Sequence, residues 1–291
     1  MGARTPGSPA RDSRAERPRV PGAAFSPWSE HVVGRDGVRL VCRDWGGPGQ
    51  PVVLLHGLAG HAGEWDVPAR KLSSRYRVVA VDQRGHGASE RHPRDVSRAA
   101  YVADVIAVVD QLGLQQPVLV GQSLGGHTAM LTAAAHPGRV RALVLVEAGS
   151  GGPNPDGPVD IGAWLDSWPT PFPSREAAAA FFGDGPVGAG WAAGLEERDG
   201  GWWPRFDRDV MVRSLTENAQ RSFWHAWTQV ACPTLLVLAQ SGFIPAEEAD
   251  AMLRQRPATM AMSIPGTGHD LHLEQPEVLH TVLSGFLDDL A

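Results

Sequence analysis

Cysteine and lysine are scarce in this chain of 291 residues, and their scarcity narrows the possible classes of protein. The two cysteines, Cys42 and Cys232, lie far apart in or beside apolar segments. Two isolated thiols of this kind favour a reduced, cytoplasmic protein over a disulfide framework. Lysine occurs once, at Lys71, and 26 basic residues stand against 32 acidic ones, which gives a net charge of −6. Because the charges form no basic stripe, the sequence argues against a nucleic-acid partner.

Long apolar runs are also missing. No stretch of 18 apolar residues occurs, so the sequence predicts no membrane span. Residues 1–27 are rich in Arg, Pro, Gly, Ala and Ser and contain no apolar core of a signal peptide. We interpret them as a disordered tail or as sequence upstream of the natural start. No His, Cys and Asp residues share a metal-ligand spacing, so we expect neither a metal nor a cofactor. The oligomeric state stays open.

The most informative motif present is Gly-Gln-Ser-Leu-Gly at residues 121–125. It follows the apolar run 117–120, which predicts a buried strand, and precedes a segment rich in Ala, Leu and Met that predicts a helix. A serine between strand and helix, with glycine two residues to either side, is typical of the strained turn that presents a nucleophile. Glycine is needed there because neighbouring backbone passes too close for a Cβ. Ser123 is therefore the candidate nucleophile.

Two further strand ends carry Gly-rich loops. The apolar run 51–55 leads into His-Gly-Leu-Ala-Gly at residues 56–60, where a backbone N–H can turn toward the serine. The expected oxyanion hole consists of the N–H groups of Leu58 and Leu124. The second loop follows the strand at residues 78–81, and we interpret its polar residues as fixing the loop and not as catalysts: Asp82, Arg84 and His86.

The candidate base lies near the C-terminus. A predicted strand at residues 260–264 is followed by Pro-Gly-Thr-Gly-His-Asp and then by a final helix from residue 276. A histidine on a Gly-flanked loop after the last strand can lie beside a nucleophile that is distant in sequence, so His269 is the candidate base. His272 lies too far along the loop to compete, and His56 belongs to the oxyanion loop.

These motifs resemble those of the α/β-hydrolase fold superfamily. The resemblance extends from about residue 29 to residue 291 and is carried by His56-Gly57, residues 121–126 and Gly268-His269. It implies a serine nucleophile with a histidine base, and a helical cap inserted after the sixth strand. The fold supports esterases, lactonases, thioesterases, amidases, C–C hydrolases, cofactor-free peroxidases and hormone receptors. Function must therefore be argued from the site.

The acid of the expected triad departs from the majority pattern of this superfamily. Most members carry an Asp on the loop after the seventh strand, but here that loop, residues 239–245, contains no carboxylate. Glu247 and Glu248 fall in the following helix and should face solvent. Glu147 ends the sixth strand, at the sheet edge where ligands bind, and is the preferred candidate because the base needs an acceptor on its second nitrogen.

Zearalenone-type lactonases and some haloalkane dehalogenases are similar in placing a Glu at this strand end, although the dehalogenases use an Asp nucleophile. The alternative is that Glu147 is a buried structural carboxylate, and that water or a main-chain carbonyl orients the histidine.

Strand-like and helix-like segments alternate from residue 51 onward, which predicts an α/β fold with a mostly parallel eight-stranded sheet and helices on both faces. Strands are expected near residues 31–33, 38–44, 52–55, 77–81, 118–120, 141–146, 234–238 and 259–264. Helices are expected near residues 62–73, 98–112, 124–135, 246–255 and 276–290. Residues 28–149 and 229–291 would form the core, and residues 150–228 a helical cap without a convincing strand.

The expected cap is rich in aromatic residues. It holds seven of the ten tryptophans and five of the eight phenylalanines. Several rings must attach the cap to its base, but a small lid has little interior, so others should face a cavity. The candidate substrate-binding residues are Trp164, Trp191, Trp202 and Trp224. An apolar, aromatic-walled pocket suits a bulky hydrophobic or aromatic substrate.

The sequence thus predicts a cofactor-free serine hydrolase that cleaves a carboxylic ester or lactone through an acyl-enzyme. Thioesters, amides and C–C bonds are alternative substrates for the same triad, although a C–C hydrolase needs a polar group to ketonise its substrate and none is evident. A ligand sensor or a non-hydrolytic biosynthetic catalyst of the same fold is the alternative from another class.

Overall fold

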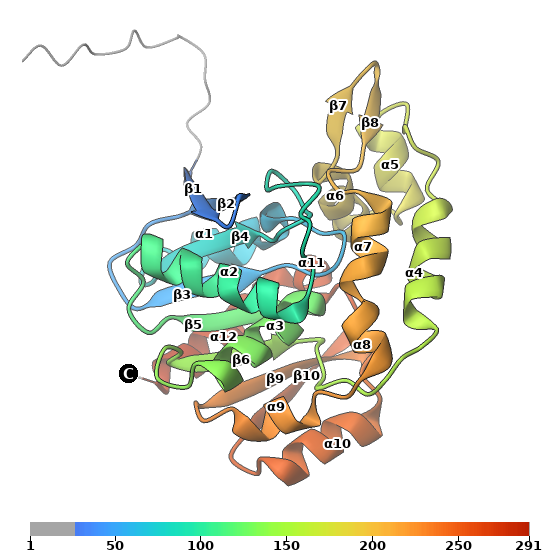
Figure 1. Ribbon diagram of the computed structural model, residues 1–291. Coiled ribbons are helices and arrows are strands. Elements are labelled where there is room, and N and C mark those ends of the chain that lie inside the picture. The colour runs from blue at the N-terminus through green and yellow to red at the C-terminus, as the bar shows by residue number, and fades with distance from the viewer. Residues whose placement is uncertain (1–26, 291) are drawn as a thin grey trace, which may run out of the picture.

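One eight-stranded sheet forms the centre of residues 27–290, the part of the chain that the computed structural model describes (Figure 1). Its strand order is β1-β2-β4-β3-β5-β6-β9-β10, in which β2 is antiparallel to both of its neighbours, β1 and β4, and all other neighbouring strands are parallel. The predicted sheet is thereby confirmed. The strands are β1 Ser29–Arg35, β2 Val38–Asp44, β3 Pro51–Leu55, β4 Arg77–Asp82, β5 Val118–Gln122, β6 Ala142–Val146, β9 Thr234–Ser241 and β10 Met260–Gly268. The tail predicted over residues 1–27 lies outside the described residues except for its last position.

The central strands are apolar on both faces because helices cover both. Every residue of β5 and β6 is buried, as expected for parallel strands between two helical layers. One layer contains α1 Asp66–Leu72 and α12 Pro276–Asp288, and the other contains α2 Arg98–Gln111, α3 Leu124–Ala135, α9 Trp224–Gln229 and α10 Ala246–Gln255. The helix predicted over residues 62–73 is divided into a 3₁₀ turn, Ala62–Trp65, and α1.

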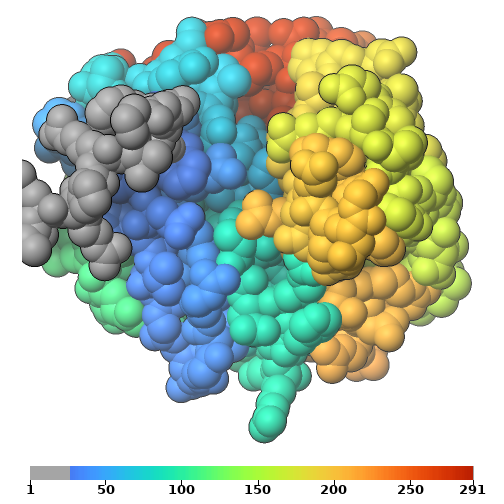
Figure 2. All heavy atoms as spheres, turned by 90° about the horizontal axis from the view of Figure 1, so that it is seen from above, coloured from blue at the N-terminus to red at the C-terminus, as the bar shows by residue number. Residues whose placement is uncertain are grey.

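The segment between β6 and β9 stands at the carboxyl ends of the parallel strands (Figure 1). We call residues 150–228 the insertion. Apart from α9, which packs on the sheet, its helices are α4 Gly157–Asp166, α5 Arg175–Phe181, α6 Pro186–Ala193, α7 Arg208–Ser214 and α8 Thr216–Gln220. In the space-filling view the yellow-to-orange insertion abuts the teal loop that follows β4 (Figure 2).

The expectation that the insertion lacks a strand is wrong. Strands β7 Glu196–Arg198 and β8 Gly201–Trp203 form an antiparallel hairpin. Its turn is Asp199-Gly200, and both residues have positive φ, at 53° and 75°. Asp-Gly is a strong signal for a two-residue hairpin turn. Strands of three residues are too short to show the alternation by which strands are recognised, so the turn was the usable signal.

Candidate functional site

Ser123 occupies a strained turn between β5 and α3. Its backbone has φ 50° and ψ −118°, a conformation that costs an ordinary residue energy and is retained only where the surrounding structure imposes it. The Ser123 N–H donates to the Val146 carbonyl at 3.0 Å, which ties the turn to the end of β6. A Cβ on Gly125 would collide with the carbonyls of Leu55 and His56, so the second glycine of the motif permits a close backbone approach. The half-buried serine lies at the amino end of α3.

The loop after β3 contacts this turn. A Cβ on Gly57 would lie 3.4 Å from the Ser123 Cβ, which places Leu58, the next residue, beside the candidate nucleophile. Neither the Leu58 N–H nor the Leu124 N–H donates a hydrogen bond to any acceptor within residues 27–290. Leu124 is the first residue of α3, and the first N–H groups of a helix have no acceptor within it. Both N–H groups are thus free to bind an oxygen atom beside Ser123.

A buried histidine fixes the same loop. His56 Nε2 accepts the Gln83 N–H at 3.0 Å, which leaves the ring proton on Nδ1, 2.7 Å from the Gly57 carbonyl. Burial, chiefly, lowers the pKa of His56, so the ring is neutral and holds both contacts at physiological pH. His56 therefore has a structural place in the loop, as the sequence predicted.

His269 and Glu147 meet at the carboxyl edge of the sheet. His269 Nδ1 lies 3.4 Å from Glu147 Oε2, and the His269 carbonyl accepts a hydrogen bond from Gln122 Nε2 at 3.1 Å. Gln122 immediately precedes Ser123, so the candidate base is tied to the nucleophile's turn. The His269 side chain is 21% exposed and that of Glu147 only 1%.

The Glu147 carboxylate lies inside the loop that follows β9. Its Oε1 accepts the Ala239 N–H at 2.6 Å, and its Oε2 accepts the Phe243 N–H at 2.9 Å. A Cβ on Gly242 would collide with this carboxylate, so the loop closes around Glu147 only because residue 242 is glycine. Strands β6 and β9 are neighbours in the sheet, so a glutamate at the end of β6 reaches the loop after β9.

The two acids in the next helix differ from one another. Glu247 is exposed, as predicted. The prediction that Glu248 faces solvent is wrong, because its side chain is half-buried and Oε1 accepts the Gly151 N–H at 2.9 Å. That contact joins α10 to the start of the insertion.

Sequence reasoning missed Phe243. Its ring stacks on the His269 imidazole with centroids 4.2 Å apart and planes 20° apart, while the residue remains 74% exposed. A large apolar side chain both on the base and in solvent marks an open side of the site. The only local signal is its position, directly after Gly242 in the loop that holds Glu147.

A second histidine–glutamate pair lies below the oxyanion loop. His272 Nε2 is 3.2 Å from Glu64 Oε2, and both side chains are buried. Burial alone would raise the pKa of Glu64, but the hydrogen bond from His272 and the nearby His61 and His272 lower it below its ordinary value. His272 thus has a structural partner 208 residues away, a pairing with no local sequence signal.

The structure brings together three of the four candidate tryptophans in the insertion. The rings of Trp164 and Trp191 have centroids 5.6 Å apart. Trp191 belongs to an apolar cluster that includes Leu58 and Ala59 of the oxyanion loop, whereas Trp164 is 37% exposed and contacts the cluster through the rings of Trp191 and Trp168. Trp202 belongs to the same cluster and lies under the Arg175 guanidinium. Trp224 lies elsewhere, on α9, where it packs against the cluster beneath α3.

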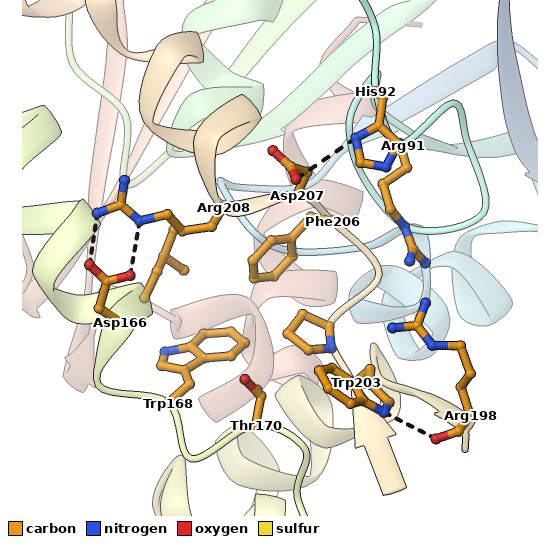
Figure 3. A pocket seen from close by; sticks show the side chains of 12 residues that line it. Arg91, His92, Asp166, Trp168, Thr170, Arg198, Trp203, Phe206, Asp207 and Arg208 are labelled. Atoms are coloured by element: carbon orange, nitrogen blue, oxygen red, sulfur yellow. Dashed lines mark hydrogen bonds and ion pairs between the residues drawn. The ribbon is translucent and has the colours of Figure 1, made fainter. Parts of the chain in front are cut away.

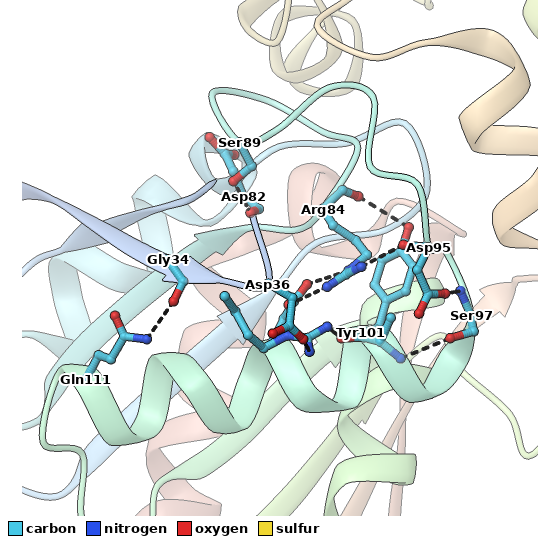
Figure 4. Close-up of polar contacts among 12 residues, drawn as sticks. Gly34, Asp36, Asp82, Arg84, Ser89, Asp95, Ser97, Tyr101 and Gln111 are labelled. Carbon is cyan, nitrogen blue, oxygen red and sulfur yellow. Dashed lines mark hydrogen bonds and ion pairs between the residues drawn. The ribbon is translucent and has the colours of Figure 1, made fainter. Parts of the chain in front are cut away.

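The loop after β4 is fixed by the residues that the sequence indicated (Figure 4). Asp82 accepts the N–H groups of Ala62 and Ala88 at 2.6 and 2.8 Å. Arg84 forms two hydrogen bonds with Asp104, at 2.5 and 2.6 Å, and is 1% exposed. These contacts support a loop-fixing role for both residues.

A surface hollow of about 460 Å³ opens between this loop and the outer side of the insertion (Figure 3). Its lining includes Trp168, Trp203 and Phe206 together with charged side chains that are largely paired, such as Arg208 with Asp166. Ser123, Glu147 and His269 do not line it. The hollow is therefore separate from the candidate catalytic residues.

No group of three or more His, Cys, Asp or Glu side chains within residues 27–290 is arranged to hold a metal ion. No helix in that part of the chain is long and apolar enough to cross a bilayer.

Comparisons with known proteins agree with this fold. The model of the alpha/beta hydrolase family matches residues 52–282. The chain is 35% identical to a non-heme chloroperoxidase of Streptomyces lividans over 59% of its own length and 66% of that protein. It is 27% identical to a putative esterase/lipase of Haemophilus influenzae over 81% and 83%. The crystal structure of E-2-(acetamidomethylene)succinate hydrolase superposes with a TM-score of 0.80 at 24% identity, covering 90% of this chain and 99% of that one. With the family match spanning most of its length, the chain belongs to the α/β-hydrolase family, and the names of its relatives support a hydrolase.

Proposed function

We propose that this protein is a serine hydrolase that cleaves a carboxylic ester or lactone of a bulky hydrophobic substrate through an acyl-enzyme. The observation that carries the proposal is the contact between His269 Nδ1 and the buried Glu147 carboxylate, on a loop tied to the turn of Ser123. An Nδ1–H held by a carboxylate leaves Nε2 as the basic nitrogen, which is the tautomer that a serine nucleophile requires.

In this mechanism His269 Nε2 takes the proton from Ser123 Oγ as the oxygen attacks the substrate carbonyl. Negative charge develops on the carbonyl oxygen, and the unpaired N–H groups of Leu58 and Leu124 are the donors for it. The imidazolium then returns its proton to the leaving alkoxide, while the Glu147 carboxylate stabilises the positive ring. Water, deprotonated by His269, cleaves the acyl-enzyme and restores the serine.

The substrate class is inferred from the apolar surroundings. Trp191 and Trp202 share a cluster that reaches Leu58, the half-exposed Trp164 packs on Trp191, and Phe243 presents an exposed ring stacked on His269. Apolar rings with few polar anchors favour a bulky hydrophobic acyl or lactone group. Trp224 is left out of this wall because it packs beneath α3.

The test is covalent labelling of Ser123 by a fluorophosphonate, read by mass spectrometry of the labelled peptide. We expect Ser123→Ala to abolish labelling and to remove several orders of magnitude of p-nitrophenyl ester hydrolysis, with a matched control, Ser222→Ala on the exposed loop before α9, unaffected. Turnover by Ser123→Ala above a few per cent of the wild-type rate would contradict the serine mechanism. A series of p-nitrophenyl esters and macrocyclic lactones of increasing apolar size tests the substrate class, and a preference for acetyl esters would contradict it.

A further inference from the structure

Helix α6 contacts both loops that carry the proposed machinery. On one side, His61 Nδ1 accepts the Gly63 N–H at 3.1 Å, so the neutral ring's proton is on Nε2, which lies 3.1 Å from the Gly190 carbonyl. On the other side, the Trp191 indole N–H donates to Asp270 Oδ2 at 3.0 Å. Consecutive residues of α6 thus bind the oxyanion loop and the residue that follows His269.

Two glycines let the helix approach this closely. Gly190 and Gly194 are four residues apart and so lie on one side of α6. A Cβ on Gly190 would lie 2.7 Å from Leu273 Cδ2, and a Cβ on Gly194 would lie 2.6 Å from His61 Cδ2. The His61 ring has hydrogen bonds on both nitrogens and little freedom to move away. Helix α6 therefore packs against Leu273 and His61 at a distance that favours glycine at both positions.

The side-chain contacts of His269 hold its ring only loosely, so a further contact that fixes its backbone is needed. Its Nδ1 lies 3.4 Å from Glu147, at the long end of hydrogen-bond distance, and one face of its ring is covered only by the exposed Phe243. The position of the imidazole therefore depends strongly on its backbone, which Gln122 holds through the His269 carbonyl and Trp191 holds through Asp270.

From these contacts we infer that Trp191 is a positioning residue, whose indole N–H holds Asp270 and thereby sets the place of His269 relative to Ser123. The inference rests on the proposed function for its effect on rate. It assigns to Trp191 a role that belongs to its N–H and is separate from the contribution of its apolar ring to a substrate wall. Displacement of a catalytic group by about 1 Å can cost on the order of a hundredfold in rate.

Trp191→Phe removes the N–H and keeps most of the ring. We expect a loss of roughly tenfold or more in kcat, on p-nitrophenyl acetate as well as on a bulky ester, with KM changed less than about twofold. Asp270→Ala should give the same loss, whereas Asp270→Asn should retain activity because it keeps an acceptor oxygen. The Trp191→Phe/Asp270→Ala double variant should lose no more kcat than either single variant. The matched control is Trp203→Phe, which removes an indole N–H that donates to the Arg198 carbonyl in the hairpin.

An activity-independent readout separates this inference from the proposed function. The ring resonance of His269, assigned by its absence in His269→Gln, should shift alike in Trp191→Phe and Asp270→Ala and stay in place in Trp203→Phe. An unchanged resonance, or losses of kcat that add in the double variant, would overturn the positioning role. A wild-type protein that neither labels with fluorophosphonate nor hydrolyses esters, yet shows the shared resonance shift, would refute the proposed function and leave the positioning role supported.

Discussion

Replacing Glu147 by Gln is the most searching test of the candidate site, because the change keeps the size of the side chain and alters only its charge and hydrogen bonding. Three donors converge on the carboxylate: the N–H groups of Ala239 and Phe243, and His269 Nδ1. A carboxylate accepts from all three, whereas an amide offers one oxygen and one NH₂ group. In either amide orientation, one NH₂ therefore faces a donor.

The orientation decides the consequence. With its oxygen toward Ala239, the amide presents NH₂ to Phe243 N–H and His269 Nδ1, which favours the histidine tautomer that lacks a proton on Nδ1 and leaves Nε2 unable to act as base. The same tautomer error in a known triad costs about 10⁴ in turnover. With the amide reversed, the N–H of the half-buried Ala239 loses its acceptor, which costs up to about 1–3 kcal/mol of folding stability. We expect a loss of about 10²–10⁴ in kcat, equivalent to roughly 3–5 kcal/mol of transition-state stabilisation.

The assay is kcat for a p-nitrophenyl ester together with the free energy of unfolding in urea. Glu247→Gln is the matched control, since the side chain is exposed on α10, and its rate should stay within about twofold of wild type. A Glu147→Gln enzyme with near wild-type kcat would refute the assignment of Glu147 as the acid. It would show that the carboxylate is structural.

Two further predictions concern stability. Burial lowers the pKa of His86 and His127 to about 3, so unfolding takes up protons below pH 6.5; stability should fall as pH drops through the window from 6.5 to 3, by about 2 kcal/mol per histidine between pH 7.5 and 5. Urea unfolding at pH 7.5 and pH 5 measures this loss of stability. His127→Phe should remove part of the difference in stability between the two pH values, whereas the exposed His92→Gln should not. Equal stabilities at both pH values would contradict the prediction. Arg84→Met should cost about 1.5–3 kcal/mol, because it removes two charge-assisted hydrogen bonds from the buried Asp104 and leaves Arg35 as the ion-pair partner of that carboxylate. Arg98→Met should cost far less, since within residues 27–290 the buried Arg98 guanidinium has no ion-pair partner. Equal losses in urea unfolding would show that ion pairing does not set the difference.

Much of the fold follows from local patterns in the sequence. The strands β3, β5 and β6 are apolar runs ended by glycine or by a charged residue, and helices α3 and α10 have the bounds that their sequences predict. The candidate nucleophile, base and oxyanion donors also lie on short motifs next to these strands. A parallel sheet brings the carboxyl ends of its strands to one edge, so residues that are adjacent only in space become predictable from their places in the element order.

The remaining features depend on contacts between segments that carry no mutual signal. The Trp191–Asp270 bond joins residues 79 apart. The sequence indicated Trp191 for its aromatic ring, and nothing in either segment predicted that its N–H binds Asp270. Trp224 lies in the aromatic-rich insertion but packs beneath α3, because its helix, α9, belongs to a helical layer that covers the sheet. An aromatic count locates a region rich in rings, but the direction of each ring is decided by the surface on which its helix docks.

Glu147 and Gly242 show how two neighbouring strand ends can build one polar contact. In the proposed mechanism the acid must deliver an oxygen to His269 Nδ1, and the Glu147 carboxylate lies 3.4 Å from that nitrogen where it enters the loop after β9. A Cβ on residue 242 would occupy the same space, so a glycine at this position leaves room for the carboxylate, to which the loop contributes two backbone N–H groups. A loop after β9 that contains no carboxylate is therefore compatible with the proposed triad, because the neighbouring strand ends in Glu and the loop contains a glycine.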